Sequence, residues 1–114
     1  MTQTLTPEAL QAEIQQEVAQ HPVLVYSKGT AEIPRCGFTM ETKQFFESLG
    51  VSATFVDVLD QPEKRQVLSA MTDWPTLPKV FIGGQFYGDT DILAPMAQKG
   101  ELQPLLQAAL GSAL

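Results

Sequence analysis

Apolar residues at helical spacing open this chain. Thr6-Pro7-Glu8 predicts a helix start, with Thr6 as the N-cap and Pro7 at the first helical position. Leu10, Ile14 and Val18 then recur at four-residue spacing and form one apolar stripe. His21-Pro22 predicts the helix end, because a residue before proline is disfavoured in the helical region. We expect residues 1–21 to form a helical extension.

Short apolar runs and longer periodic segments alternate along the rest of the chain. The last two apolar runs are joined by Gly83-Gly84, which predicts a tight hairpin. Phe38, Phe45 and Leu49 share one face of a predicted helix that Gly50 ends. We expect strands over residues 23–26, 53–58, 79–82 and 85–87, and helices over 38–49, 61–71, from 90 onwards and over 101–110.

The order of these elements predicts the fold class. Two strands joined by a helix form a β-α-β unit, which requires parallel strands and a right-handed crossover. The terminal hairpin adds antiparallel strands to the same sheet. We therefore expect an α/β protein with a mixed four-stranded sheet flanked by helices, the thioredoxin-like arrangement, as a single domain over residues 1–114.

Composition narrows the class of protein. The chain has 114 residues, 44% hydrophobic and 18% charged, which is the profile of an ordinary globular protein. Its formal charge of -6 predicts repulsion of nucleic acid and anionic membranes, and no apolar run reaches the length of a bilayer span. The acidic start, without basic residues, predicts neither a secretory nor a transit signal. With one cysteine, no internal disulfide forms, so we expect a reducing compartment, the cytoplasm.

The single cysteine, Cys36, lies between a loop and a predicted helix. The unpaired N–H groups and the positive end of the helix dipole favour the thiolate, so its pKa should fall below the free value. Lys28 and Arg35 add positive charge nearby in the sequence. The alternative is a buried structural cysteine, but Pro34 and Gly37 are poor core neighbours.

A lone thiol limits the chemistry. Cys36-Gly37-Phe38-Thr39 is a CxxC motif with threonine in the last place, so an oxidised Cys36 needs an external thiol to resolve it. One cysteine does not supply the four thiolates that a [2Fe-2S] cluster normally takes, whereas two chains and two small-molecule thiols do. His21 is the only histidine, which argues against a zinc site.

Four sequence blocks resemble the signature of the monothiol glutaredoxins, which typically carry Cys-Gly-Phe-Ser. They are Lys28-Gly29, Pro34 to Thr39, Trp74-Pro75-Thr76-Leu77-Pro78 and Gly88-Asp89-Thr90-Asp91. The resemblance runs in order over residues 22–106. It implies that Cys36 is the reactive thiol and contributes one cluster ligand per chain, and that glutathione is bound by Lys28, Phe38, Arg65, Thr76, Leu77, Pro78, Thr90 and Asp91.

Within that resemblance each group has an expected role. Lys28 approaches the glycine-end carboxylate or the sulfur ligand, and Arg65 and the backbone near Thr76 hold the glycine end. Leu77, before a cis Pro78, presents its backbone to the ligand's peptide. The helix opening at Thr90 and Asp91 receives the γ-glutamyl group. The alternatives are solvated surface charges for Lys28 and Arg65, a trans proline, and a plain first-turn acid for Asp91; Trp74 is expected to pack.

Four positions depart from the family pattern. Thr39 replaces the usual serine, and Thr90 stands where many members carry another cysteine. Asp89 replaces a glycine, which adds negative charge near the expected glutamyl site and suits a positive φ less well. Pro95 falls in the first turns of a predicted helix, where it is expected to cost a hydrogen bond and kink the helix.

Three functions remain open on the sequence. The resemblance favours a glutathione-dependent carrier of a [2Fe-2S] cluster shared across a homodimer, monomeric without the cluster, for cluster transfer or iron and redox sensing. Its partners would be a BolA-like protein and apo iron–sulfur clients. The alternative is an oxidoreductase, at most weak, that reduces protein–glutathione mixed disulfides through Cys36. The third is a non-redox interaction module that has kept the fold.

Overall fold

The computed structural model of the protein describes residues 5–111, and the elements follow the expected order. Residues 1–4 of the predicted extension lie outside the described residues. Thr6 caps the first helix, with its hydroxyl accepting from the Ala9 N–H, and Pro7 occupies the first helical position as expected. The helices are α1 Pro7–Gln20, α2 Gly37–Ser48, α3 Pro62–Thr72, α4 Thr90–Gln98 and α5 Leu102–Leu110, and the strands are β1 Val23–Ser27, β2 Thr54–Asp57, β3 Lys79–Ile82 and β4 Gln85–Gly88.

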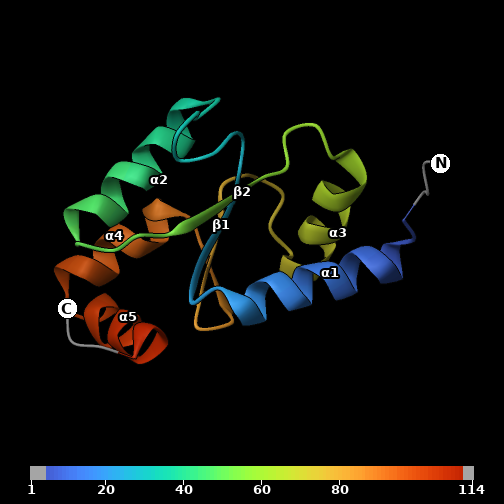
Figure 1. Ribbon diagram of the computed structural model, residues 1–114. Helices are drawn as coiled ribbons and strands as arrows, with labels where there is room; N and C mark the ends of the chain where they lie inside the picture. Colours follow the sequence, from blue (N-terminus) through green and yellow to red (C-terminus); the bar gives the residue numbers. More distant parts are fainter. Residues whose placement is uncertain (1–4, 112–114) are drawn as a thin grey trace.

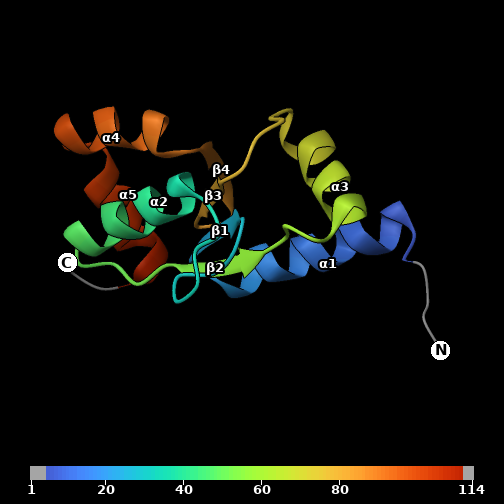
Figure 2. The same ribbon diagram turned by 90° about the horizontal axis from the view of Figure 1, so that it is seen from above.

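The sheet has the mixed topology that the element order predicts. Its strand order is β2-β1-β3-β4, with β1 and β2 parallel and the β1–β3 and β3–β4 pairs antiparallel. Helices α2, α4 and α5 lie on one side of the sheet, and α1 and α3 lie on the other (Figures 1 and 2). The thioredoxin-like arrangement is confirmed.

Strand β1 forms the centre of the core because both of its faces are covered. Val23 and Val25 pack toward α2, α4 and α5, whereas Leu24 and Tyr26 pack toward α1 and α3. Each such side chain contributes on the order of 1.5–3 kcal/mol through burial. A continuous run of buried side chains is typical of a strand covered on both faces.

The buried face of α2 differs from the expected one. Phe45 and Leu49 pack only partly against the core, and Phe38 is 65% exposed. The fully covered residues are Thr39, Thr42 and Phe46. The Thr42 hydroxyl donates to the Phe38 carbonyl at 2.8 Å, so this polar group is satisfied inside the core.

Helix α1 is held to α3 by buried charge. Lys64 of α3 is 3% exposed, and its ammonium lies 3.0 Å from carboxylate oxygens of both Glu13 and Glu17. The Tyr26 hydroxyl donates to Glu17 at 2.7 Å, and the Lys64 ammonium lies 5.7 Å from the centre of the Tyr26 ring. Burial and the bond to Glu17 raise the pKa of Tyr26 well above its ordinary value. The extension is therefore packed onto the rest of the chain.

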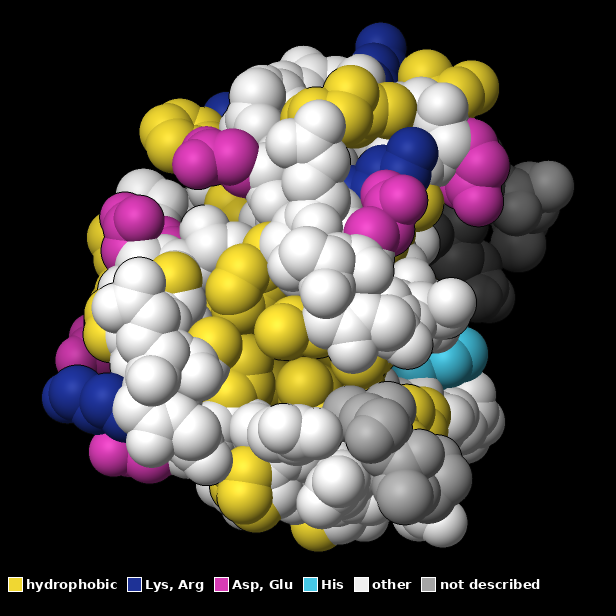
Figure 3. Space-filling view, turned by 90° about the vertical axis from the view of Figure 1, so that its left-hand side faces the viewer, with side chains coloured by type: hydrophobic (Ala, Val, Ile, Leu, Met, Phe, Trp, Pro, Cys, Tyr) yellow, Lys and Arg dark blue, Asp and Glu magenta, His cyan; other side chains and the backbone are white. Residues whose placement is uncertain are grey.

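An apolar hollow marks the face formed by α2, α4 and α5 (Figure 3). It measures about 180 Å³ and contains no titratable side chain, being lined by Leu49, Ala97, Gly100, Leu102, Gln103 and Leu106. Helix α4 on this face continues through Pro95 to Gln98. Over residues 5–111, no helix has both the length and the apolarity to cross a membrane.

Candidate functional site

Cys36 is the N-cap of α2 and follows a closed loop over residues 28–35. The Arg35 N–H donates to the Lys28 carbonyl at 2.9 Å, and Gly29 and Pro34 form an isolated antiparallel bridge. Gly29 has φ of +89°, and a Cβ there would lie 2.4 Å from the Ile33 carbonyl oxygen. Only glycine fits this position, so the loop that delivers Cys36 depends on it.

The surroundings of Cys36 favour its thiolate. Its sulfur lies 3.3 Å from the Thr39 hydroxyl oxygen. Burial raises the pKa of the thiol, but the Thr39 hydroxyl, the N–H groups of Thr39 and Phe38 and the charge of Lys28 together lower it below its ordinary value. The expected direction of the shift is confirmed. It comes from the first turn of the helix and one lysine.

Thr39 links the sulfur to the loop. Its side chain is fully buried, and its hydroxyl oxygen lies 3.0 Å from the Lys28 carbonyl oxygen and 3.3 Å from the Cys36 sulfur. The single hydroxyl proton is donated to one of these two acceptors at a time. The methyl group that distinguishes threonine from serine is therefore turned into the packed interior. We expect it to stabilise the first turn of α2 without covering the thiol.

Asp57 anchors the other side of the loop. One oxygen of its carboxylate accepts the Gly29 N–H and the Leu59 N–H, each at 2.9 Å. The bonds from Leu59 and Gly29 lower the pKa of Asp57 below its ordinary value. Asp57 ends β2 beside the end of β1, so it connects the loop before Cys36 to the edge strand.

A cleft of about 370 Å³ lies at the carboxyl end of β1. Phe38, two residues after Cys36, lines it, whereas Cys36 itself is not among the lining residues. The cleft brings together all eight residues expected to bind glutathione, from five separate segments: Lys28, Phe38, Arg65, Thr76, Leu77, Pro78, Thr90 and Asp91, together with Pro75 and Asp89. Its size lies in the usual range of small-molecule sites. The assignment of these residues to glutathione stays a prediction.

The basic and acidic residues of the cleft come from different segments of the chain. Lys28 and Arg65 bring positive charge, and the Arg65 guanidinium donates to the Leu59 carbonyl at 3.3 Å. Asp89 and Asp91 bring negative charge at the start of α4. A zwitterionic ligand with carboxylates and an ammonium fits such a lining better than a simple anion does.

Asp89 takes a different conformation from the one considered for this position. Its φ is -136°, so the backbone is extended and no glycine is needed. It is the N-cap of α4, and its carboxylate accepts the Asp91 N–H at 3.0 Å. The carboxylate therefore occupies part of the helix N-terminus that the sequence assigns to the γ-glutamyl group.

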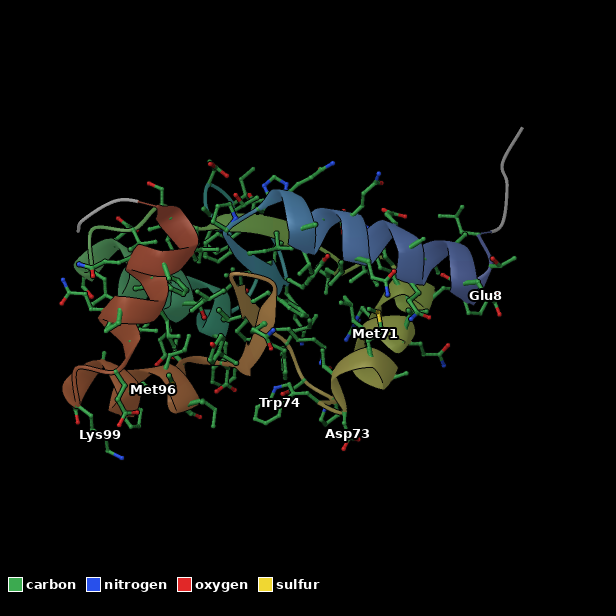
Figure 4. All side chains as sticks on the ribbon, turned by 90° about the horizontal axis from the view of Figure 1, so that it is seen from below. Glu8, Met71, Asp73, Trp74, Met96 and Lys99 are labelled. Atoms are coloured by element: carbon green, nitrogen blue, oxygen red, sulfur yellow. The ribbon has the colours of Figure 1, made fainter. Side chains whose placement is uncertain are left out.

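The segment between α3 and β3 forms one wall of the cleft. The Leu77–Pro78 peptide bond is cis, as expected. Trp74 lies on this segment below the hairpin (Figure 4) and packs edge-on against Phe86 with 6.0 Å between ring centres. Its expected packing role is confirmed.

Sequence reasoning missed several residues that build the site. Pro75 lines the cleft directly, and Asp57 and Lys79 hold its walls. The only sequence signal for the two supports is weak: Asp57 ends a strand, and Lys79 is the charged first residue of an otherwise apolar one. Neither stands in one of the four family-like blocks.

The donor set at Cys36 limits what it can ligate. Among the described residues, no three His, Cys, Asp or Glu side chains are grouped to hold a metal ion. A single thiolate with an adjacent cleft is suited to a group whose remaining ligands come from a bound thiol and a second chain.

Comparison with known proteins gives one consistent family. The glutaredoxin family profile matches residues 23–87. The probable monothiol glutaredoxin GrlA of Legionella pneumophila is 43% identical over 89 residues, which are 78% of this chain and 100% of that protein. Glutaredoxin 4 of Escherichia coli K12 is 37% identical over 94 residues, 82% of each chain. The crystal structure of a buckwheat glutaredoxin–glutathione complex has a TM-score of 0.81 at 26% identity and covers 95% of this chain and 96% of its own.

Proposed function

Since the chain belongs to the glutaredoxin family and carries the single reactive-site thiol of its monothiol members, we propose that it binds glutathione and a [2Fe-2S] cluster shared across a homodimer. Its role is iron–sulfur cluster transfer or iron and redox sensing. The observation that carries the proposal is the pairing of one thiolate-favouring cysteine with one adjacent cleft per chain.

The number of thiolates supports a shared cluster. Each chain offers Cys36 alone, and each bound glutathione adds one thiol. Two chains and two glutathione molecules therefore supply the four sulfur ligands that a [2Fe-2S] cluster takes. Within the described residues no other metal-binding group is available.

The assembly and its partners follow from that ligand set. The protein is a monomer without the cluster and a homodimer with it, and its partners are a BolA-like protein and apo iron–sulfur clients. Its net charge of -6 disfavours nucleic acid and membrane surfaces. We propose the cytoplasm as its compartment, because a thiol that must stay reduced suits a reducing environment.

A second function is favoured by the lowered pKa of Cys36. The Cys36 thiolate attacks the glutathione sulfur of a protein–glutathione disulfide, forms a Cys36–glutathione disulfide and releases the protein thiolate. A second glutathione thiolate attacks that disulfide, which yields oxidised glutathione and restores the Cys36 thiolate. One cysteine per chain is sufficient for both exchanges.

Anaerobic reconstitution with iron, sulfide and glutathione separates the two functions. We expect a coloured protein of dimeric mass, and loss of both colour and dimer in Cys36→Ser or when glutathione is left out. Ser48→Ala is the control, because this exposed hydroxyl donates to the Phe45 carbonyl at the opposite end of α2 from Cys36. A colourless monomer that rapidly reduces a glutathione mixed disulfide would contradict the cluster proposal and support the oxidoreductase.

A further inference from the structure

Lys79 is a buried charge that the proposed chemistry does not use. It opens β3 opposite Tyr26 and is 1% exposed. Its ammonium donates to the Trp74 carbonyl and, at 3.0 Å, to the Thr76 carbonyl. In the part of the chain that the structure describes, no carboxylate pairs with it.

Burying an ammonium without a carboxylate partner is energetically unfavourable, so the groups that it contacts indicate why it is buried. Removing such a charge from water costs several kcal/mol unless its donors are satisfied. Burial lowers the pKa of Lys79 to about 8. The next three residues of the strand are Val80, Phe81 and Ile82, so an apolar side chain would suit the strand itself better. The contacts of the ammonium lie instead in the wall of the cleft.

Both acceptors belong to the segment that faces the cleft. Trp74 precedes Pro75, and Pro75, Thr76 and Leu77 all line the cavity. The Thr76 carbonyl and the Leu77 N–H form one peptide group. A cation on the carbonyl polarises that group and makes its N–H a stronger donor. The same two bonds fix the backbone of residues 74–76, which directly precede Leu77.

We propose that Lys79 is a positioning residue for glutathione, whose ammonium fixes residues 74–76 and strengthens the Leu77 N–H as a donor to the peptide of the ligand. The inference rests on the proposed function in one respect, namely that glutathione occupies the cleft. It goes beyond that function because it gives a role in glutathione affinity to Lys79, which does not line the cleft.

Lys64 provides a matched control. It is also a nearly fully buried lysine, 3% exposed, on the same side of the sheet. Its partners are Glu13 and Glu17 of α1, whereas those of Lys79 are carbonyls of the cleft wall. Lys64→Met therefore removes a buried ammonium and alters stability without touching residues 74–77.

Calorimetric titration with glutathione and with S-methylglutathione measures the effect on affinity. We expect Lys79→Met to bind both about tenfold more weakly, Lys79→Gln to recover part of that loss through its amide donors, and Lys64→Met to bind like the wild type. Equal affinity in the wild type and Lys79→Met would overturn the inference. So would an equal loss in Lys64→Met, which would show that general stability sets the affinity.

A second measurement uses the protein without ligand. We expect the Leu77 amide proton to shift and to exchange faster with solvent in Lys79→Met, while the amides of β1 stay unchanged. An unaltered Leu77 amide would refute the positioning role. If the wild type binds no glutathione, the proposed function fails, and the Leu77 amide still tests whether Lys79 fixes the wall.

Discussion

Asp89 places a negative charge in the lining of the cleft. Its carboxylate accepts the Asp91 N–H and so caps α4, and it lines the cavity beside Thr90. A ligand carboxylate arriving at this helix N-terminus meets a like charge that already uses one donor. The residue therefore stabilises the helix and weakens the same end as an anion site.

Asp89→Asn should bind glutathione about two- to fivefold more tightly, because asparagine keeps the cap and removes the charge. Calorimetric titration measures the change. Glu101→Gln is the control, since it removes an exposed acid next to α5, away from the cleft. Weaker binding in Asp89→Asn would mean that this carboxylate contacts the ligand directly.

Lys79 should make stability depend on pH in the alkaline range. Its pKa is about 8 when folded and 10.5 as a free side chain, so between these values the unfolded chain binds more protons. The unfolding free energy of the wild type relative to Lys79→Met should therefore rise by about 3 kcal/mol from below pH 8 to above pH 10.5.

Urea titrations of both proteins at several pH values test this. Tyr26 acts in the opposite sense, since its raised pKa makes stability fall at high pH, but it is present in both proteins and cancels in the difference. A flat difference would show that the two carbonyls compensate fully for burial of the ammonium.

At the scale of elements, the loop over residues 28–35 depends on the two strands beside it. Gly29 is fixed to the Asp57 carboxylate at the end of β2, and the Thr39 hydroxyl fixes Lys28 to α2. The loop is exposed, with Ile33 at 71%, so these bonds supply order that packing does not. The position of Cys36 therefore depends on β2, on α2 and on the loop over residues 28–35.

Asp57→Ala should destabilise the fold by about 1–3 kcal/mol, because it leaves the N–H groups of Gly29 and Leu59 without their acceptor. Faster amide exchange at Gly29 and a lower urea midpoint are the expected results. The advantage of the wild type should shrink as pH falls below 3.8, because the carboxylate of the folded state, whose pKa is lowered, then takes up its proton.

Asp60→Ala is the control for this prediction, because it removes a neighbouring carboxylate that is 83% exposed and that pairs, among residues 5–111, only with Arg35. Its effect should stay within about 1 kcal/mol. Equal losses in the two variants would show that charge alone, rather than the two N–H bonds of Asp57, orders the loop.

The elements that sequence patterns locate well are those in which apolar residues do the packing. Residues 79–82 and the Gly83-Gly84 turn are observed as predicted, and β1 differs only by the addition of Ser27. The patterns fail where polar groups are buried: Thr39 and Thr42 in α2, Lys64 in α3 and Lys79 in β3. Hydropathy treats such residues as exposed, whereas the structure satisfies them with backbone carbonyls or carboxylates.

In the candidate site, too, the sequence predicts some residues well and misses the buried polar contacts. The family-like blocks predict which residues meet, and all eight expected glutathione residues line one cleft. They do not predict what holds the walls in place, because Asp57 and Lys79 act through bonds to the backbone of distant segments. Such contacts depend on the three-dimensional path of the chain and leave little trace in a local motif.

At the scale of the whole molecule, charge connects the outermost helix to the interior. Lys64 lies between Glu13, Glu17 and the ring of Tyr26, so α1, α3 and β1 meet at one ammonium. Glu13 and Glu17 are partly exposed, whereas Lys64 is not. Removing both acids would leave a buried cation without its partners.

Glu13→Ala combined with Glu17→Ala should lower the unfolding free energy by about 3–5 kcal/mol, measured by urea unfolding. The control is Glu41→Ala with Glu47→Ala, which removes the same charge from exposed positions on α2 and should cost less than about 1 kcal/mol. A small effect of the first pair would mean that Lys64 reaches solvent once α1 loses its acids.

Helix α1 precedes residue 23, the first that the family profile matches, yet it is not a detachable accessory. Lys64 holds it, and the adjacent Arg65 lines the cleft. One turn of α3 thus contacts α1 through Lys64 and the cleft through Arg65. A chain that began at the family boundary would uncover the apolar side chains of Leu24, Tyr26 and Leu68, which pack around Ile14 of α1.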